Sequence, residues 1–549
     1  MALRKNRNYF VSDIEVVLRN ESSDGSDAVN HLLLGDWLRY TGEESSDWAR
    51  MRSRGTTGWL PKSSFSDRRL LEVNFVDIGQ GDGCHIVTPD DQIILIDSGE
   101  DDNMYRFLNW RYNLRRLKVA GVDDILEGDQ GTRGPVHLDH VIISHPDKDH
   151  YFGFKKIFEN RKLKPLRIYH NSLVERTIRR EERDPGLRYY SNDDLGGYVK
   201  TQGESYAWDL ITTNQKMHDL IAAHASTRKL YLSTLKAARL NNPEVQFIAL
   251  SKDDEYIDGF GESEPLRFKV LGPLTEAITY NDESKRCLIR LGAEGITKNG
   301  HSVILQLQMG KLKVMLGGDL NTQSEDYLLK HYGETTRAVS KLEERIYQLQ
   351  AKGCSIDSDE TQELAEKRTE IDAIVARARR HFQVDITKAC HHGSHHFSET
   401  FLRTLNAVVT VISSGDDEGY SHPRPDALGS FGKYSRGIRP LIFSTELARN
   451  TREFTNVYDY FELLKTYEKR IEEAFSPSEK KRLIREMQER RDRNVVVYGM
   501  ITLRTDGEKV IVAQKIEAPR KLSEKWDIHE LRYNDDMHEL AYVRSGKAH

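Results

Sequence analysis

Four side chains that commonly bind metal ions lie within six residues of the sequence: His145, Asp147, Asp149 and His150. The residues just before them, 141–143, are branched and apolar, which is typical of a short buried strand. Two imidazoles and two carboxylates placed so close together would be costly to desolvate without a cation between them. A solvated polar loop is the alternative, since His and Asp are common in loops. The spacing after an apolar strand favours a divalent metal site.

The same pattern, an apolar strand that stops at candidate ligands, recurs elsewhere in the chain. The segments are 92–96 before Asp97, 311–316 before Asp319, and 384–388 before His391 and His392. Residues at the ends of strands meet at the edge of a sheet, where loops carry most functional groups. We therefore expect these side chains to gather around the 145–150 loop.

Length and composition limit the class of protein. The chain has 549 residues, 38% hydrophobic and 30% charged, which predicts a globular protein of about two or three domains, or one large domain with insertions. With 81 basic against 86 acidic residues, the net charge of −5 argues against a globally basic nucleic-acid binder but not against a local basic groove. The sequence contains no apolar run of about 18 residues, so no membrane span is expected, and no signal peptide is recognisable. Widely spaced cysteines predict no disulfides and a cytoplasmic location.

The hydrophobic pattern divides the chain into three parts. Residues 1–68 alternate short apolar runs with polar turns, as in a small β-barrel. Residues 69–515 carry the strands and the candidate ligands, and 516–549 are expected to be a polar tail. Charged segments interrupt the middle part: a mostly helical insertion at about 172–245, a helical hairpin at 321–384 and a helical arm at 447–493. The hairpin is a candidate for a dimer arm or an active-site cap, or is a solvated insertion, and the segment 447–493 is a further insertion or arm.

The N-terminal part resembles an SH3 domain in three stretches: Leu34-Gly-Asp-Trp37, Asp47-Trp48 and Gly58-Trp59-Leu-Pro61. It departs from that family at Ser64, where a tyrosine of the peptide groove would stand. The resemblance implies a barrel that binds protein partners, or one that docks internally onto the rest of the chain.

Six motifs of residues 71–515 together resemble the metallo-β-lactamase fold, and within it hydrolases of the competence DNA-internalisation (ComEC-type) family. They are D-I-G-Q-G-D at 77–82, L-I-D-S-G at 95–99, S-H-P-D-K-D-H at 144–150, L-G-G-D at 316–319, K-A-C-H-H-G-S at 388–394 and Y-S-H-P at 420–423. The fold class implied is α+β, an αββα sandwich of two mixed sheets packed face to face, here with helical insertions and a preceding SH3-like barrel. The site would lie at the strand ends.

The resemblance also implies a set of metal ligands for two divalent ions: His145, Asp147, Asp149, His150, Asp319, His391 and His392. The first two would hold one ion, the next two the other, and Asp319 would bridge them. One of the two adjacent histidines, with His392 preferred, would complete the second site.

Catalysis in such a site is hydrolysis by a water that the ions activate. The residues expected to take part are Asp149, His392, His422 and Lys388, the last two as contacts for a phosphate. Asp97 and Asp82 would support the ligands without binding metal. Asp97 would do so by orienting the imidazole of a ligand histidine.

Two departures from the wider fold bear on the metal. The common second motif has a histidine at the position of Asp147, and a carboxylate there shifts preference toward Mn²⁺ or Mg²⁺, with Zn²⁺ still compatible. No histidine for a separate third motif is recognisable, which leaves the first ion with fewer protein ligands.

The leading functional hypothesis is a two-metal phosphodiesterase or nuclease acting on DNA or RNA. Four arginines of the first insertion, Arg176, Arg179, Arg180 and Arg183, are candidates for a basic groove, although glutamates lie among them. The alternatives are a small-molecule phosphoesterase, such as one acting on cyclic nucleotides or phosphorylcholine esters, and an interaction or effector subunit of a larger complex, such as a bacterial defence system. A homo-oligomer is compatible with all three.

Overall fold

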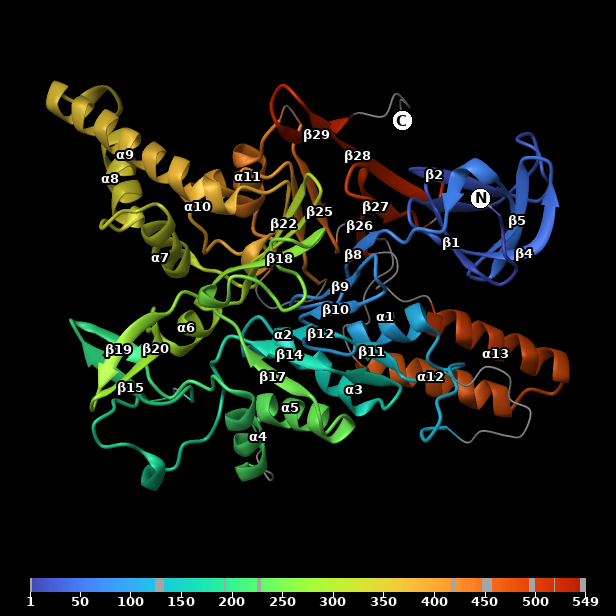
Figure 1. Ribbon diagram of the computed structural model, residues 1–549, viewed down its shortest axis with the longest axis horizontal. Coiled ribbons are helices and arrows are strands. Elements are labelled where there is room, and N and C mark those ends of the chain that lie inside the picture. Colours follow the sequence, from blue (N-terminus) through green and yellow to red (C-terminus); the bar gives the residue numbers. More distant parts are fainter. Residues whose placement is uncertain are drawn as a thin grey trace.

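The computed structural model gives a mixed α+β protein (Figure 1). It describes residues 2–123, 133–191, 194–224, 229–415, 421–437, 439–446, 457–492, 499–517 and 519–543. The predicted α+β class is therefore confirmed.

The largest sheet has ten strands and joins both ends of the 69–543 region. Across the sheet these are β17 (Gln246–Ala249), β14 (Arg167–His170), β12 (His140–Ile142), β10 (Ile93–Ile96), β9 (Cys84–Val87), β8 (Leu71–Phe75), β26 (Ile501–Thr505), β27 (Val510–Lys515), β28 (Trp526–Asn534) and β29 (Glu539–Val543). β8 pairs with β26 in antiparallel register, so strands from opposite ends of this region are direct neighbours. β10, β12, β14 and β17 run parallel.

A second sheet packs on one face of the first. Its six strands are β18 (Leu266–Gly272), β21 (Ile304–Met309), β22 (Leu312–Leu316), β23 (Ile386–Lys388), β24 (Val409–Ile412) and β25 (Leu441–Ser444). Apolar side chains from both sheets, among them Val73, Leu503, Leu307 and Val314, form one fully buried cluster. Burial of so many branched residues in one continuous core is the main force that stabilises the two sheets against each other.

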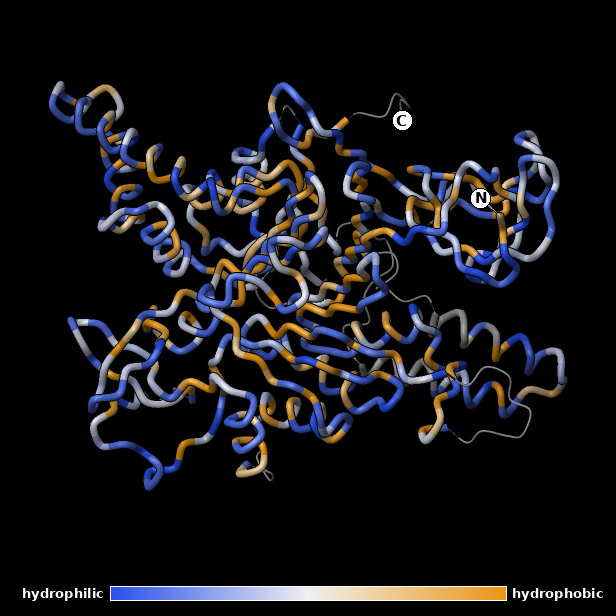
Figure 2. The backbone as a smooth tube through the Cα atoms, in the orientation of Figure 1, coloured by the Kyte–Doolittle hydropathy of each residue, from blue (hydrophilic) through white to orange (hydrophobic). Residues whose placement is uncertain are grey.

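Helices cover the two outer faces. The ten-stranded sheet is covered by α1 (Asn103–Tyr112), α3 (Gly153–Glu159), α4 (Asn214–Ala223) and α5 (Leu230–Asn241), and the six-stranded sheet by α7 (Thr322–Tyr332), α8 (Val339–Ala351), α9 (Ser358–Phe382), α10 (Glu399–Leu405) and α11 (Pro425–Tyr434). The layers are thus helix, sheet, sheet and helix. Figure 2 shows the hydrophobic residues concentrated in the central strands. Within the described residues, no helix has both the length and the apolar character needed to cross a membrane.

The N-terminal part forms its own seven-stranded antiparallel sheet. Its strands are β1 (Asn8–Val11), β2 (Glu15–Arg19), β3 (Ala28–Leu33), β4 (Trp37–Ser45), β5 (Trp48–Ser53), β6 (Thr56–Pro61) and β7 (Phe65–Ser66). It has a small core of its own and also contacts the ten-stranded sheet, where Leu33 and Leu34 pack against Ile511 and Ala513. The contact fixes this unit to the body of the molecule.

The segment 172–245 is only partly helical, which corrects the expectation of a mostly helical insertion. Its second half contains α4 and α5, but β15 (Tyr198–Thr201) and β16 (Glu204–Ala207) join β19 (Glu276–Tyr280) and β20 (Glu283–Ile289) in a four-stranded sheet. The turn between β15 and β16 contains Gly203 at φ +88°, and Tyr206 and Trp208 lie in the hydrophobic cluster of this sheet. Aromatic residues at alternate positions around a glycine turn favour a hairpin over a helix. A short parallel pair, β11 (Val136–Leu138) and β13 (Leu163–Pro165), precedes this segment in the sequence.

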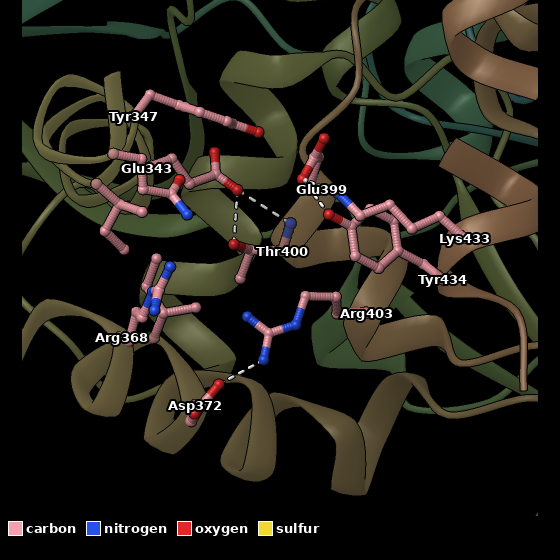
Figure 3. Close-up of a pocket in the computed structure, with 12 residues that line it drawn as sticks. Glu343, Tyr347, Arg368, Asp372, Glu399, Thr400, Arg403, Lys433 and Tyr434 are labelled. Atoms are coloured by element: carbon pink, nitrogen blue, oxygen red, sulfur yellow. Dashed lines mark hydrogen bonds and ion pairs between the residues drawn. The ribbon is translucent and has the colours of Figure 1, made fainter. Parts of the chain in front are cut away.

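Residues 321–384 contain the predicted hairpin, formed by α8 and α9 after the separate helix α7. A pocket of about 310 Å³ lies where this hairpin meets α10 and α11 (Figure 3). Glu343 of α8 accepts hydrogen bonds there from the backbone N–H of Thr400 at 3.0 Å and its Oγ1 at 2.6 Å. The hairpin therefore anchors the start of α10. The arm at 447–493 forms α12 (Val457–Glu472) and α13 (Pro477–Asp492), and its first ten residues lie outside the described part.

The described part of the segment 516–549, which ends at residue 543, is not a polar tail, and this is the second correction. β28 pairs with β27, and β29 with β28, so both strands extend the ten-stranded sheet. Leu531 and Leu540 are each 1% exposed and join the core between the sheets. Their isolated positions among polar residues reflect a strand with one face buried and one face in water.

Candidate metal centre

The candidate ligands lie at one edge of the two packed sheets. Asp97 follows β10, and the 145–150 loop follows β12, its parallel neighbour. In the facing sheet Asp319 follows β22, and His391 and His392 follow β23, which is again parallel to its neighbour. Parallel strands end at the same edge, and the two sheets face each other across the core, so residues far apart in sequence converge.

Four side chains form a compact group of potential ligands: Asp149, His150, Asp319 and His392. One ligand atom from each lies within 4.8 Å of all the others. Oδ2 of Asp319 is 3.1 Å from Nε2 of His392 and 3.3 Å from Nε2 of His150. Two imidazole nitrogens and two carboxylate oxygens suit Zn²⁺ or Mn²⁺.

Each histidine of the group is oriented by a buried carboxylate behind it. His150 Nδ1 donates to Oδ2 of Asp97 at 2.9 Å, and Oδ1 of Asp82 lies 3.1 Å from Nδ1 of His392. Asp97 also accepts from the backbone N–H and the hydroxyl of Ser144, at 2.8 and 2.6 Å. A carboxylate behind the imidazole fixes the ring and presents the other nitrogen to a metal, which is the usual arrangement around ligating histidines. Both rings accordingly direct Nε2 toward Asp319.

The charges of the site fit a divalent cation. Burial alone would favour a neutral ring, but the carboxylates of Asp319, Asp149 and Asp97 raise the pKa of His150 well above its ordinary value. Against the same effect of burial, Asp319 and Asp82 raise the pKa of His392 to about 10. The buried Nε2 atoms of both rings make no well-aligned hydrogen bond within the described residues. Carboxylates that draw protons onto two imidazoles, with nitrogens left unbonded, are the environment that a metal ion would balance.

The backbone is locally strained where it presents the ligands. Asp97, His391 and His392 have φ of +55°, +49° and +54°, in the left-handed region that non-glycine residues rarely adopt. Such conformations cluster at functional sites, where surrounding contacts impose them. Gly81, in the D-I-G-Q-G-D loop, has φ +104°, and a Cβ there would lie 1.8 Å from the carbonyl oxygen of Asp149. This glycine allows its loop to pack directly against the loop that carries Asp149.

His145 and Asp147 lie beside the four-ligand group but are not members of it. His145 is fully buried, and its Nε2 is 4.0 Å from Oδ2 of Asp147. Asp147 makes an ion pair at 2.7 Å with Lys298, a residue that our reading of the sequence did not identify. The expected first ion site is therefore less complete than the second.

The remaining predicted residues divide between the interior and the rim. Lys388 is buried, forms an ion pair with Asp82 and donates to the carbonyl oxygen of Gly318 at 3.2 Å, which places it beneath the ligands rather than at the surface. His391 is half-buried, with Nε2 3.9 Å from Oδ2 of Asp319. The ring of His422 lies 5.9 Å from that of His391, at the rim. Tyr420 of the last motif lies outside the described residues.

Two serines also escaped prediction. The hydroxyl of Ser144 lies between Asp97 and His145, and that of Ser302 accepts from the backbone N–H of Asp319 at 3.1 Å and lies 3.3 Å from His145 Nδ1. Ser144 directly precedes the candidate ligand His145 in the S-H-P-D-K-D-H motif, and this position in the sequence could have identified it. Ser302 has no such marker, because its contacts arise only when the two sheets pack.

A buried acid supports the loop that follows His392. Glu325 of α7 accepts a hydrogen bond from the backbone N–H of Ser398, near the start of α10. Burial raises the pKa of Glu325 to about 8, and the charge of Glu343 adds to this, while the N–H of Ser398 opposes it. The proton on Glu325 thus favours the folded state.

This acid predicts a loss of stability as the pH rises. Its pKa in the folded state lies above the unfolded value of 4.5, so its contribution is complete below that value and declines until about pH 8. Between pH 5 and pH 9 the wild type should therefore lose roughly 2–4 kcal/mol of unfolding free energy that Glu325→Gln keeps. In urea unfolding, the midpoint of the variant should accordingly rise relative to that of the wild type between pH 5 and pH 9. Exposed Glu366→Gln is the control. An equal pH dependence in wild type and Glu325→Gln would contradict this role.

The arrangement could hold a divalent metal ion between the two sheets, with the ligand imidazoles oriented by Asp97 and Asp82 and with His422 at the rim. Such a centre can activate a water molecule and stabilise negative charge on a reacting oxygen. The chain matches no protein-family model and none of the curated proteins with which it was compared.

Proposed function

We propose that the protein is a metal-dependent phosphodiesterase of the metallo-β-lactamase fold that hydrolyses nucleic acid, with DNA as the leading substrate. The observation that carries this is the group of Asp149, His150, Asp319 and His392 at the edge of two packed sheets. The order of the sequence motifs supports the fold, and the donor set suits the metals used for hydrolysis of phosphate esters.

The residues of the centre would contribute in different ways. A bound ion would supply a water of lowered pKa and stabilise charge on the attacked phosphate. Asp97 and Asp82 keep the imidazoles of His150 and His392 in place, so that no reorganisation is needed when charge develops. His422 at the rim is within reach of a phosphate held there, whereas buried Lys388 balances the charge of Asp82 and Asp319.

The basic groove expected from the first insertion needs revision. Arg176 is 8% exposed and donates to the carbonyl oxygens of Val174, Leu195 and Asp209 at 2.8–3.2 Å, so it braces the insertion. Arg179, Arg180 and Arg183 remain exposed and are still candidates for backbone contacts.

A panel of labelled substrates tests the function. We expect the purified protein with Mn²⁺ to cleave DNA, and Asp149→Ala to lose this cleavage by at least about 100-fold, because a direct ligand is removed. Single- and double-stranded DNA, RNA and a chromogenic phosphodiester are compared in time courses. Glu366→Gln, on an exposed carboxylate of α9, is the control.

The panel also separates the alternatives. Turnover of the chromogenic diester or a cyclic nucleotide without cleavage of any nucleic acid would favour a small-molecule esterase. Absence of turnover with every metal, or equal cleavage by Asp149→Ala, would refute the proposed activity.

A further inference from the structure

A buried lysine lies beside the metal centre, on α6 (Glu294–Gly300). The side chain of Lys298 is 9% exposed, and its Nζ is 2.7 Å from Oδ1 of Asp147 and 2.7 Å from Oε1 of Glu175. Glu294 lies further away, at 3.8 Å. Three carboxylates thus surround one ammonium group, which connects the 145–150 loop to the first insertion.

Both oxygens of Asp147 have partners on α6. Lys298 bonds Oδ1, and the side-chain amide of Asn299, in the orientation that satisfies its own hydrogen bonds, donates to Oδ2 at 2.9 Å and to the carbonyl oxygen of Gly295 at 2.8 Å. Asp147 is the residue that would hold the first of two ions together with His145. With its oxygens bonded to α6, it is poorly placed to do so.

We propose that the ammonium of Lys298 stands in place of a second cation, so that the centre holds one divalent ion, bound by Asp149, His150, Asp319 and His392. The inference rests on the metal centre of the proposed function and corrects its expected stoichiometry of two ions. An ammonium group among carboxylates supplies the positive charge that an ion would otherwise provide. It is also fixed to the chain, and no dissociation can remove it.

The surroundings keep this lysine charged. Burial disfavours its charged form, but Asp147 and Glu175 outweigh that effect and raise the pKa of Lys298 above its ordinary value. Without the ammonium, the carboxylates of Asp147, Glu175 and Glu294 would be left close together, and Oδ2 of Asp147 lies 4.0 Å from Nε2 of His145. Buried carboxylates without a counter-charge are unfavourable, and a divalent cation is the species that would relieve them.

Metal stoichiometry tests the proposal independently of turnover. The full chain is stripped with chelator, reloaded with Mn²⁺, freed of excess metal and assayed for manganese by mass spectrometry, with titration calorimetry in parallel. We expect about one equivalent in the wild type and in Lys298→Arg, and about two in Lys298→Met, whose neutral side chain vacates the carboxylates. Lys298→Arg is the matched control, because it keeps the charge.

Asp147→Asn provides a second arm if Lys298→Met fails to fold. Because Asp147 neither binds the retained ion nor orients one of its ligands, the variant should keep about one equivalent. Its loss of metal affinity should stay below about 10-fold, the lower limit for residues that support a ligand. Two equivalents in the wild type, reduced to one by Asp147→Asn, would overturn the proposal while leaving the proposed function intact. No bound metal in the wild type would instead refute the metal centre on which both depend.

Discussion

Asp319→Asn is expected to abolish metal binding and hydrolysis together. The Oδ2 atom of Asp319 lies within 3.3 Å of Nε2 in both His150 and His392, and the side chain is almost fully buried, so its charge is the centre of the ligand group. An amide keeps the shape but removes that charge. Because disturbing even supporting residues costs roughly 10–100-fold in metal affinity, loss of this ligand should cost at least about 100-fold. Titration calorimetry with Mn²⁺ and the cleavage time course measure the two effects.

The stability of metal-free Asp319→Asn should fall as well, although the amide keeps the shape of the side chain. Without metal, the buried carboxylate of Asp319 is paired with the protonated imidazoles of His150 and His392, which hold its pKa well below its ordinary value. The amide leaves these rings without that counter-charge, so the variant should unfold at lower urea concentration than the wild type in chelator. Exposed Glu366→Gln should match the wild type in metal binding, cleavage and stability. Retention of full metal affinity by Asp319→Asn would show that the ion is held elsewhere.

Asp97→Asn is expected to lower the metal affinity of the centre, although Asp97 is not itself a metal ligand. Asp97 accepts three hydrogen bonds, from His150 Nδ1 and from the N–H and hydroxyl of Ser144, and it is 1% exposed. An amide nitrogen in place of one oxygen cannot accept the proton of His150, so the ring loses its orientation. We expect a loss of metal affinity of about 10–100-fold and of roughly 3 kcal/mol in unfolding free energy. Urea unfolding of the metal-free protein and Mn²⁺ titration measure these separately.

A surface aspartate provides the comparison for this loss of stability. Asp67 pairs with Arg7 at 3.2 Å, and both side chains are nearly half exposed. Asp67→Asn should cost less than about 1 kcal/mol, as exposed ion pairs usually do. If Asp97→Asn behaved like Asp67→Asn, the carboxylate behind His150 would be dispensable, and the proposed support of the imidazole would be wrong.

The sequence allowed the centre to be located because each ligand follows an apolar strand. Asp149, His392 and Asp319 are far apart along the chain, yet the repeated pattern of strand and ligand was enough to predict that they meet. The layering of the sheets was expected from the resemblance of the six motifs to a known fold, and strands that are apolar throughout, which must be buried on both faces, agree with it.

The partners of Asp147 could not be foreseen. Lys298 and Asn299 lie in a short polar helix with no motif, and their contact with Asp147 depends on how α6 packs beside the 145–150 loop. Long-range ion pairs leave no periodic trace in a sequence. β28 and β29 were missed because a strand with one face in solvent has few apolar residues. Leu531 and Leu540 are the only buried hydrophobic residues in these two strands.

The pairing of β8 with β26 has a consequence for biosynthesis. Phe75 lies opposite Ile501, so the edge of β8 is left without a partner until nearly the whole chain has left the ribosome. Contacts between such distant residues form slowly, because a long loop must close first. A nascent chain that stops short of β26 exposes an apolar strand edge, which is prone to pair with other chains. We therefore expect the sandwich to form late, after synthesis of its last strands, and fragments ending before residue 500 to aggregate rather than fold.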